Sequence, residues 1–259
     1  MVGRSIGNVW VTDRDEMALS WFRIVRISNV QAVRWLLGAV NGWDHPVQIR
    51  QAQRWVSRME TAGMIRRINL GGPGGSIVWA TFEVTQASKP NIHGQTTRHE
   101  IAVSAASARF AAAGYAWRRD DRPDWAGGHQ ADGVAIGVGD DSALIEVELT
   151  PKRAPRYMSI FSAYSHRLDR RDARRVVYLC NPDSARAVRI ALNQATGRRI
   201  ADRVDIHEVF DARSSLWPSE ALPTWLAPPQ PRFVADVAQQ RAARPSGFTL
   251  NRALARHRS

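Results

Sequence analysis

The stretch SALIEVELTPK (residues 142–152) decides the fold of the second half of the chain. Its apolar run is typical of a buried β-strand, in which successive side chains point to opposite faces. Ile145 and Val147 therefore share one face, and Glu146 and Glu148 lie on the other, roughly 7 Å apart. Two carboxylates on one face of a buried strand repel each other and are expensive to bury without a partner. The sequence leaves three ways to offset that cost: a cation, a nearby arginine, or water at a sheet edge.

The segments around this strand alternate between helical and extended patterns. We expect helices over 98–115, 154–168 and 183–197, and further strands over 129–138, 174–181 and 201–212. The order helix, strands, helix, strand, helix, strand is typical of an α/β sandwich. The sequence therefore predicts an α/β domain over residues 98–212.

The first ninety residues have a different pattern. Three helices are expected, followed by two strands around the glycine turn GGPGG: helices 12–26, 28–38 and 46–63, and strands 64–70 and 76–85. Ser28 is the expected cap of the second helix and Gly38 its expected stop. A glycine turn between two apolar runs predicts a hairpin.

This order of parts is that of a winged helix-turn-helix, and RQAQRWVSRMETAGMIRR (residues 50–67) resembles the recognition helix and exit of such domains. The resemblance implies a DNA-binding domain over residues 10–86, with its third helix in the major groove. Side chains expected near base edges are Gln48, Arg50, Gln51 and Arg54; those expected on phosphates are Arg58, Arg66 and Arg67. The alternative is a protein-docking winged helix whose arginines are solvated.

The charge balance favours a polyanionic partner. The formal net charge is +12 with a pI near 11.2, which points first to nucleic acid and second to an acidic membrane surface. Lys89 and Lys152 are the only lysines, so arginine supplies nearly all of the positive charge, as is typical of GC-rich coding sequence. Unlike lysine, arginine can also donate two parallel hydrogen bonds to a phosphate or to the edge of a guanine.

Other bulk features exclude several classes of protein. No run approaches 18 apolar residues, so we expect no membrane span, and the opening residues lack the apolar stretch of a signal peptide. A single cysteine, Cys180, excludes an internal disulfide and points to a reducing cytoplasm, where we expect it to be a buried structural thiol. The histidines show no zinc-site spacing. His129 is a candidate for the rim of a site around Asp132, and His99 is expected to be a cap or surface residue.

Asp132 and Glu146 are spaced as in the PD-(D/E)xK nuclease core, which the order of elements in this half also resembles. The resemblance implies a restriction-endonuclease-like α/β core in which Asp132 and Glu146 hold Mg²⁺, with Glu100 as a further acid. The sequence departs from that pattern because Glu148 stands where the superfamily has lysine. Lys152, four residues further, is the nearest substitute. The counter-charges of the acids could instead come from Arg153 and Arg156.

The whole chain resembles the replication-relaxation family of plasmids and other mobile elements, through WVSRMETAGMIRR, IVWAT, RHEIAV, ADGV and IEVELT, over about residues 13–210. That resemblance implies a two-domain α/β protein, an N-terminal winged helix-turn-helix followed by a nuclease-like domain. Residues 87–97 are expected to form a linker, and 213–259 a basic, Pro- and Arg-rich tail.

The function implied is a cytoplasmic protein that binds double-stranded DNA in the replication, transfer or regulation of a mobile element. The substitution at Glu148 leaves open whether the second domain cleaves DNA. The alternatives are an active Mg²⁺-dependent DNA endonuclease and a protein-interaction module without DNA contact. A homodimer is also expected, because winged-helix proteins often read two half-sites.

Overall fold

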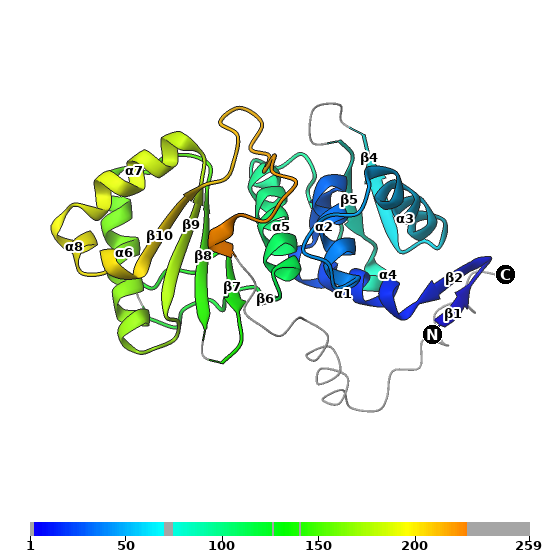
Figure 1. Ribbon diagram of the computed structural model, residues 1–259, viewed down its shortest axis with the longest axis horizontal. Helices are drawn as coiled ribbons and strands as arrows, with labels where there is room; N and C mark the ends of the chain where they lie inside the picture. Colours follow the sequence, from blue (N-terminus) through cyan, green and yellow to red (C-terminus); the bar gives the residue numbers. More distant parts are fainter. Residues whose placement is uncertain (1–2, 70–74, 126, 140, 227–259) are drawn as a thin grey trace.

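The computed structural model describes residues 3–69, 75–125, 127–139 and 141–226. Within these ranges the chain is a mixed α/β protein with eight α-helices and three β-sheets (Figure 1). Most of the expected GGPGG turn, and residues 227–259 of the expected tail, lie outside the described residues. Among the described helices, none is both long and apolar enough to cross a bilayer.

The N-terminal unit consists of helices around a small antiparallel sheet. Its elements are β1 (Gly3–Ile6), β2 (Val9–Thr12), α1 (Asp13–Val25), β3 (Ile27–Asn29), α2 (Val30–Val40), α3 (Ile49–Thr61), β4 (Ile65–Ile68), β5 (Ile77–Ala80) and α4 (Phe82–Thr85). β5 lies between β3 and β4 and is antiparallel to both, while β1 and β2 form a separate hairpin. The expected three helices and two strands are present in the expected order, but the second strand, expected over 76–85, ends at Ala80, and Phe82–Thr85 form the short helix α4.

Local hydrogen bonds set where these helices begin. Thr12 and Asp15 form a reciprocal capping box at the start of α1. The second helix begins one residue later than expected, because Asn29 rather than Ser28 is its cap. Asn29 Oδ1 accepts a hydrogen bond of 2.8 Å from the amide of Ala32. Ser28 instead contacts Ser104 through its hydroxyl, at 3.0 Å.

The sequence predicted that Gly38 would end α2, but Gly38 lies inside the helix. A Cβ at this position would lie 2.1 Å from the carbonyl oxygen of His45, so glycine is required by a close backbone approach. Gly38→Ala should therefore lower the midpoint of thermal unfolding, at a cost of about 1–3 kcal/mol. In an open helix the same change would be stabilising. A raised midpoint in calorimetry would contradict this account of Gly38.

The C-terminal unit contains a five-stranded mixed sheet in the order β10-β9-β8-β7-β6. Its strands and helices are α5 (Thr97–Ala112), β6 (Ala116–Arg118), β7 (Gly133–Ile136), β8 (Ser142–Glu148), α6 (Ala154–Asp169), β9 (Arg175–Cys180), α7 (Pro182–Leu192), α8 (Ala195–Arg198) and β10 (Val204–Glu208). β8, β9 and β10 are parallel, whereas β6, β7 and β8 are antiparallel. Helices α6 and α7 cover one face of the sheet, and α5 covers the other (Figure 1).

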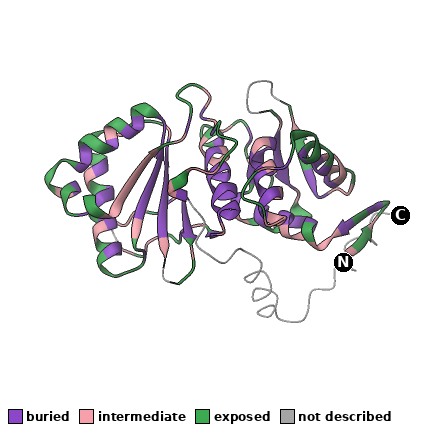
Figure 2. Cartoon of the chain, viewed as in Figure 1, coloured by how far each residue is buried: buried purple, intermediate pink, exposed green. Residues whose placement is uncertain are grey.

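Helix α5 belongs to two hydrophobic cores at once. Ala105 and Ala108 pack with the N-terminal unit, while Val103 and Phe110 pack with the sheet. The helix is consequently buried on nearly all sides (Figure 2). Its many alanines suit this position, because small side chains let packed elements approach closely on two sides. The expected linker therefore leads into a helix that both units share.

The first residues of the expected C-terminal tail are packed rather than exposed. Trp217 is buried against the α5 side of the sheet, and Leu226 is buried in the same core. Arg109 of α5 lies between the rings of Trp35 and Trp217, 4.6 Å from each ring centroid. Residues 213–226 thus pack against α5 and help hold it between the two units. The packed part of the chain therefore extends past residue 213, the expected start of the tail.

Candidate functional site

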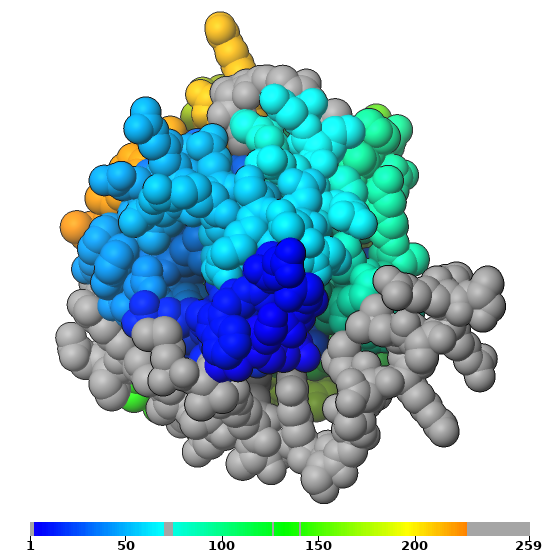
Figure 3. All heavy atoms as spheres, turned by 90° about the vertical axis from the view of Figure 1, so that its right-hand side faces the viewer, coloured from blue at the N-terminus to red at the C-terminus, as the bar shows by residue number. Residues whose placement is uncertain are grey.

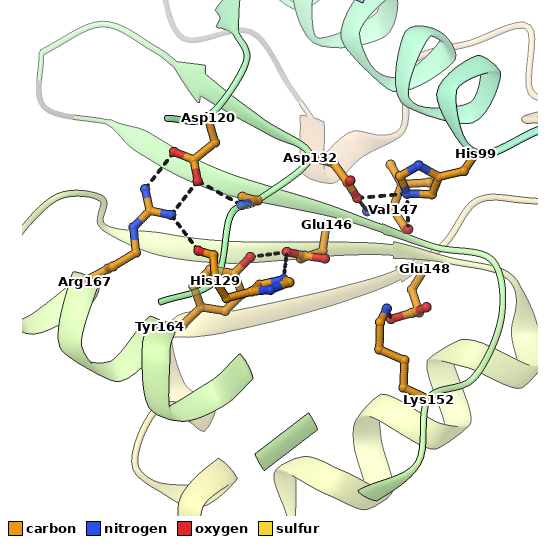
Figure 4. A network of polar contacts seen from close by, with 11 residues as sticks. His99, Asp120, His129, Asp132, Glu146, Val147, Glu148, Lys152, Tyr164 and Arg167 are labelled. Atoms are coloured by element: carbon orange, nitrogen blue, oxygen red, sulfur yellow. Dashed lines mark hydrogen bonds and ion pairs between the residues drawn. The ribbon is translucent and has the colours of Figure 1, made fainter. Parts of the chain in front are cut away.

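A cleft of about 310 Å³ opens at the carboxyl end of β8, between the start of α5 and the loop before α6. We call it the acid cleft, after the three carboxylates that line it: Asp132, Glu146 and Glu148. They come from the segment that leads into β7 and from β8, so the predicted convergence of these acids at one end of the sheet is present. Lys152, His99 and His129 also line the cleft, and Figure 4 shows the network they form with the acids.

Asp132 is held by the chain and by a histidine. Its Oδ2 accepts a 2.8 Å hydrogen bond from the amide of Val147 and lies 3.2 Å from Nε2 of His99. That nitrogen is also 3.1 Å from the carbonyl oxygen of Val147. Burial alone would lower the pKa of His99, but the hydrogen bond and charge of Asp132 outweigh it, and the pKa is raised.

Glu146 is buried, with only 4% of its surface exposed. Its Oε1 lies 2.9 Å from Nε2 of His129 and also accepts the hydroxyl of Tyr164 in α6 (Figure 4). Burial raises the pKa of the Tyr164 hydroxyl, and the adjacent carboxylate raises it further, so this hydroxyl stays protonated and donates. Alternation along β8 thus turns Glu146 towards α6.

Glu148, on the same face of β8, is buried and forms an ion pair with Lys152. Burial raises the pKa of Glu148, and the charge of Lys152 partly offsets this, while Glu146 and Asp132 raise it further. The repulsion expected between the two strand acids is therefore present. The offset comes from Lys152, which folds back across the turn that contains Pro151.

Three candidates from the sequence lie elsewhere. Glu100 does not line the cleft but pairs with Arg119, because it lies on the side of α5 away from its neighbour His99. Arg153 and Arg156 are exposed and make no ion pair with the cleft acids among the described residues. The two histidines and Lys152 take the place of the expected arginines. His129, expected at the rim of a site around Asp132, does line the cleft. His99, expected to be a cap or surface residue, instead contacts Asp132, because packing brings the start of α5 to the cleft.

Asp132 and Glu146, the expected Mg²⁺ ligands, both line the acid cleft, but each is paired with a histidine of the protein. Mg²⁺ binds carboxylate oxygens at about 2.0–2.1 Å in near-octahedral geometry, so the ligands must surround one point. Within the described residues, no group of three His, Cys, Asp or Glu side chains is placed to hold a metal ion. Each cleft carboxylate instead faces a donor from the protein itself.

Cys180 ends β9 and is fully buried. Burial raises the pKa of its thiol well above the ordinary value, and Glu148 raises it further. Since the thiolate is the reactive form, Cys180 is a structural residue rather than a nucleophile.

A second candidate site is the exposed face of α3, which carries the side chains expected near base edges. Gln48, Arg50, Gln51 and Arg54 are all exposed, whereas Ala52, Trp55, Val56 and Met59 are buried on the opposite face. Neither Arg50 nor Arg54 has an acidic partner within the described part of the chain. In Figure 3 the light-blue and cyan surface of α3 and β4 lies beside the dark-blue β1–β2 hairpin.

Arg58, which was expected to contact a phosphate, forms an ion pair within the protein. Its Nη2 lies 2.5 Å from Oδ1 of the buried Asp15, and its Nη1 donates to Asp15 and to the carbonyl of Trp10. Successive positions four apart on a helix rotate by about 40°, so eight residues carry Arg58 well away from Arg50 and towards α1. Arg58, expected on a phosphate, is therefore already paired with an acid of the protein, and 38% of its side chain stays exposed.

The arginines of β4 remain near the surface. Arg66 is exposed, and Arg67 is exposed beside Glu60, with 2.9 Å between Nε and the nearer carboxylate oxygen. Alternation on the strand directs the two side chains to opposite faces.

Comparison with known proteins adds no assignment to this geometry. No family model, no curated protein and no solved structure matches the chain.

Proposed function

We propose that this chain binds double-stranded DNA through α3 and the β4–β5 hairpin, in the manner of a winged helix-turn-helix. The observation that carries the proposal is the exposed pair Arg50 and Arg54, which share one face of α3. A cation at an exposed position with no acidic partner is available to a phosphate or to the edge of a guanine. The basic net charge and the helix–helix–hairpin order support the same proposal.

The biological role proposed with it is action on a plasmid or other mobile element, in replication, transfer or regulation. This rests on the resemblance of the ADGV and IEVELT segments, and of the helix exit, to the replication-relaxation family. Asp132 and Glu146, which belong to those segments, both line the acid cleft, which supports a nuclease-like interpretation of the five-stranded sheet.

DNA cleavage at the acid cleft is the second candidate function. The observation that favours it is the gathering of Asp132, Glu146, Glu148 and Lys152 around one opening, with Arg98 also lining it. Acids that could bind a divalent cation, with basic residues beside them, suit a phosphodiester backbone.

Removing Arg50 and Arg54 together should weaken binding to a duplex by about 1–3 kcal/mol per arginine. For each arginine that binds a phosphate, its removal should also reduce the slope of log affinity against log salt by about 1. Both quantities can be measured by gel shift or fluorescence anisotropy on a duplex, in EDTA so that no cleavage occurs.

The matched control is the double variant Arg186→Ala and Arg199→Ala, which removes the same charge from exposed positions of the other unit. It should leave affinity nearly unchanged if binding is local to α3. Equal losses in both double variants would show that general charge, not this surface, drives association. Unchanged affinity without Arg50 and Arg54 would refute the proposed interface.

A further inference from the structure

The three carboxylates of the acid cleft each have a separate donor from the same chain. His99 lies against Asp132 at 3.2 Å, His129 against Glu146 at 2.9 Å, and Lys152 forms an ion pair with Glu148. The three carboxylates are the groups whose charge a divalent cation would otherwise neutralise.

The contacts of His99 indicate where its proton lies. Nε2 of His99 is close to the carbonyl oxygen of Val147, which can only accept a hydrogen bond. That nitrogen therefore carries hydrogen and has no lone pair for a metal. Nε2 of His129 likewise faces a carboxylate oxygen, which accepts.

The position of His129 is fixed by a buried ion pair behind it. Asp120 and Arg167 are joined by two hydrogen bonds of 2.6 and 2.8 Å. Asp120 also accepts from the amide of Ala131 at 2.8 Å, and Arg167 approaches the carbonyl of His129 at 3.4 Å (Figure 4). The segment that bears His129 is thus held in place by groups of the protein itself.

We propose that His129 and Lys152 are internal donors that occupy Glu146 and Glu148, and that a divalent cation can enter the acid cleft only by displacing them. The proposal deepens the nuclease-like interpretation, since it concerns what the cleft acids bind, but it does not depend on DNA. It explains why acids buried on one strand are tolerated in the folded chain. It also means that removing one of these donors turns the cleft into a better metal site.

The test is Mn²⁺ titration of the full chain, followed by thermal unfolding. A ligand that binds only the folded state raises the melting temperature, and does so more as its affinity rises. The wild type should respond weakly. His129→Ala and Lys152→Met should melt lower without metal and bind Mn²⁺ more tightly by about tenfold or more, because the ion no longer has to displace a donor; tenfold corresponds to about 1.4 kcal/mol.

His93→Ala is the matched control, since His93 is exposed and lies outside the cleft. It should respond to Mn²⁺ as the wild type does. Adding Glu146→Ala to His129→Ala should remove the gain, because it removes the carboxylate that the ion would bind.

Two results would overturn the proposal. If His129→Ala loses a Mn²⁺ response that the wild type shows, His129 is a metal ligand. If both cleft variants respond as the wild type does, the pairs do not compete with metal. Should His129→Ala fail to fold, Lys152→Met still decides, because Lys152 is only half-buried. Duplex binding in EDTA, measured separately, shows whether the proposed DNA-binding function fails independently.

Discussion

Asp120→Ala should lower the free energy of unfolding by about 3–5 kcal/mol, a larger loss than we expect from any of the other substitutions. The Asp120 side chain is 1% exposed and pairs with Arg167, which is also buried. Without the carboxylate, the guanidinium remains in the interior with its main counter-charge removed. Urea or thermal denaturation, followed by circular dichroism, measures the loss.

The neighbouring residue provides the control. The Asp121 side chain is 93% exposed and pairs with Arg118 at the surface, so Asp121→Ala should cost about 1 kcal/mol or less. The double change Asp120→Leu with Arg167→Met should recover much of the lost stability, because it removes both buried charges. Similar losses for the two aspartates would contradict the role assigned to burial.

Asp15→Ala should be nearly as damaging, with a loss of about 3 kcal/mol. Asp15 is buried and accepts hydrogen bonds from Thr12, Trp55 and Arg58, which link α1 to the end of β2 and to α3. Its removal leaves the indole of Trp55 and one end of α1 without their acceptor. Glu16→Ala is the matched control, because Glu16 pairs with Arg4 at the surface and should matter little.

The contribution of Asp15 should also depend on pH. Burial raises its pKa, but the hydrogen bonds of Arg58, Thr12 and Trp55 together hold it below the ordinary value of 3.8. The ionised form is therefore favoured more in the folded chain than in the unfolded chain. This stabilisation is present in full above the unfolded pKa and is lost as pH falls through the lower, folded pKa. The stability gap between wild type and Asp15→Asn should shrink over that acid range, and a gap independent of pH would contradict the pairing.

Local signals in the sequence predicted most of the regular elements. The period of α3 and the apolar run of β8 each depend on neighbours within one element. The strands β1, β2, β3 and β6 were not predicted, because each is only three or four residues long and is stabilised by its pairing partner. Gly38 was misread for the same reason, since the carbonyl that requires it belongs to a later loop.

The candidate site was predictable only in part. Asp132, Glu146, Glu148 and Lys152 lie on one hairpin and its exit, so strand geometry was enough to bring them together. The partners of these acids come from α5, α6 and the segment before β7, and no spacing rule connects His99 or Tyr164 with them. The pairing of Arg58 with Asp15 likewise depends on how α3 lies against α1.

The helix α5, shared by both hydrophobic cores, sets the spacing between the two units. Because Ala105 and Ala108 pack towards the N-terminal helices while Val103 and Phe110 pack towards the sheet, the two units that carry the face of α3 and the acid cleft meet on one packed helix. The distance between the face of α3 and the acid cleft therefore depends on how closely the two units pack against α5. Six of the sixteen residues of α5 are alanine, which keeps that distance short. A larger side chain on a packed face of α5 would increase the distance between the face of α3 and the acid cleft.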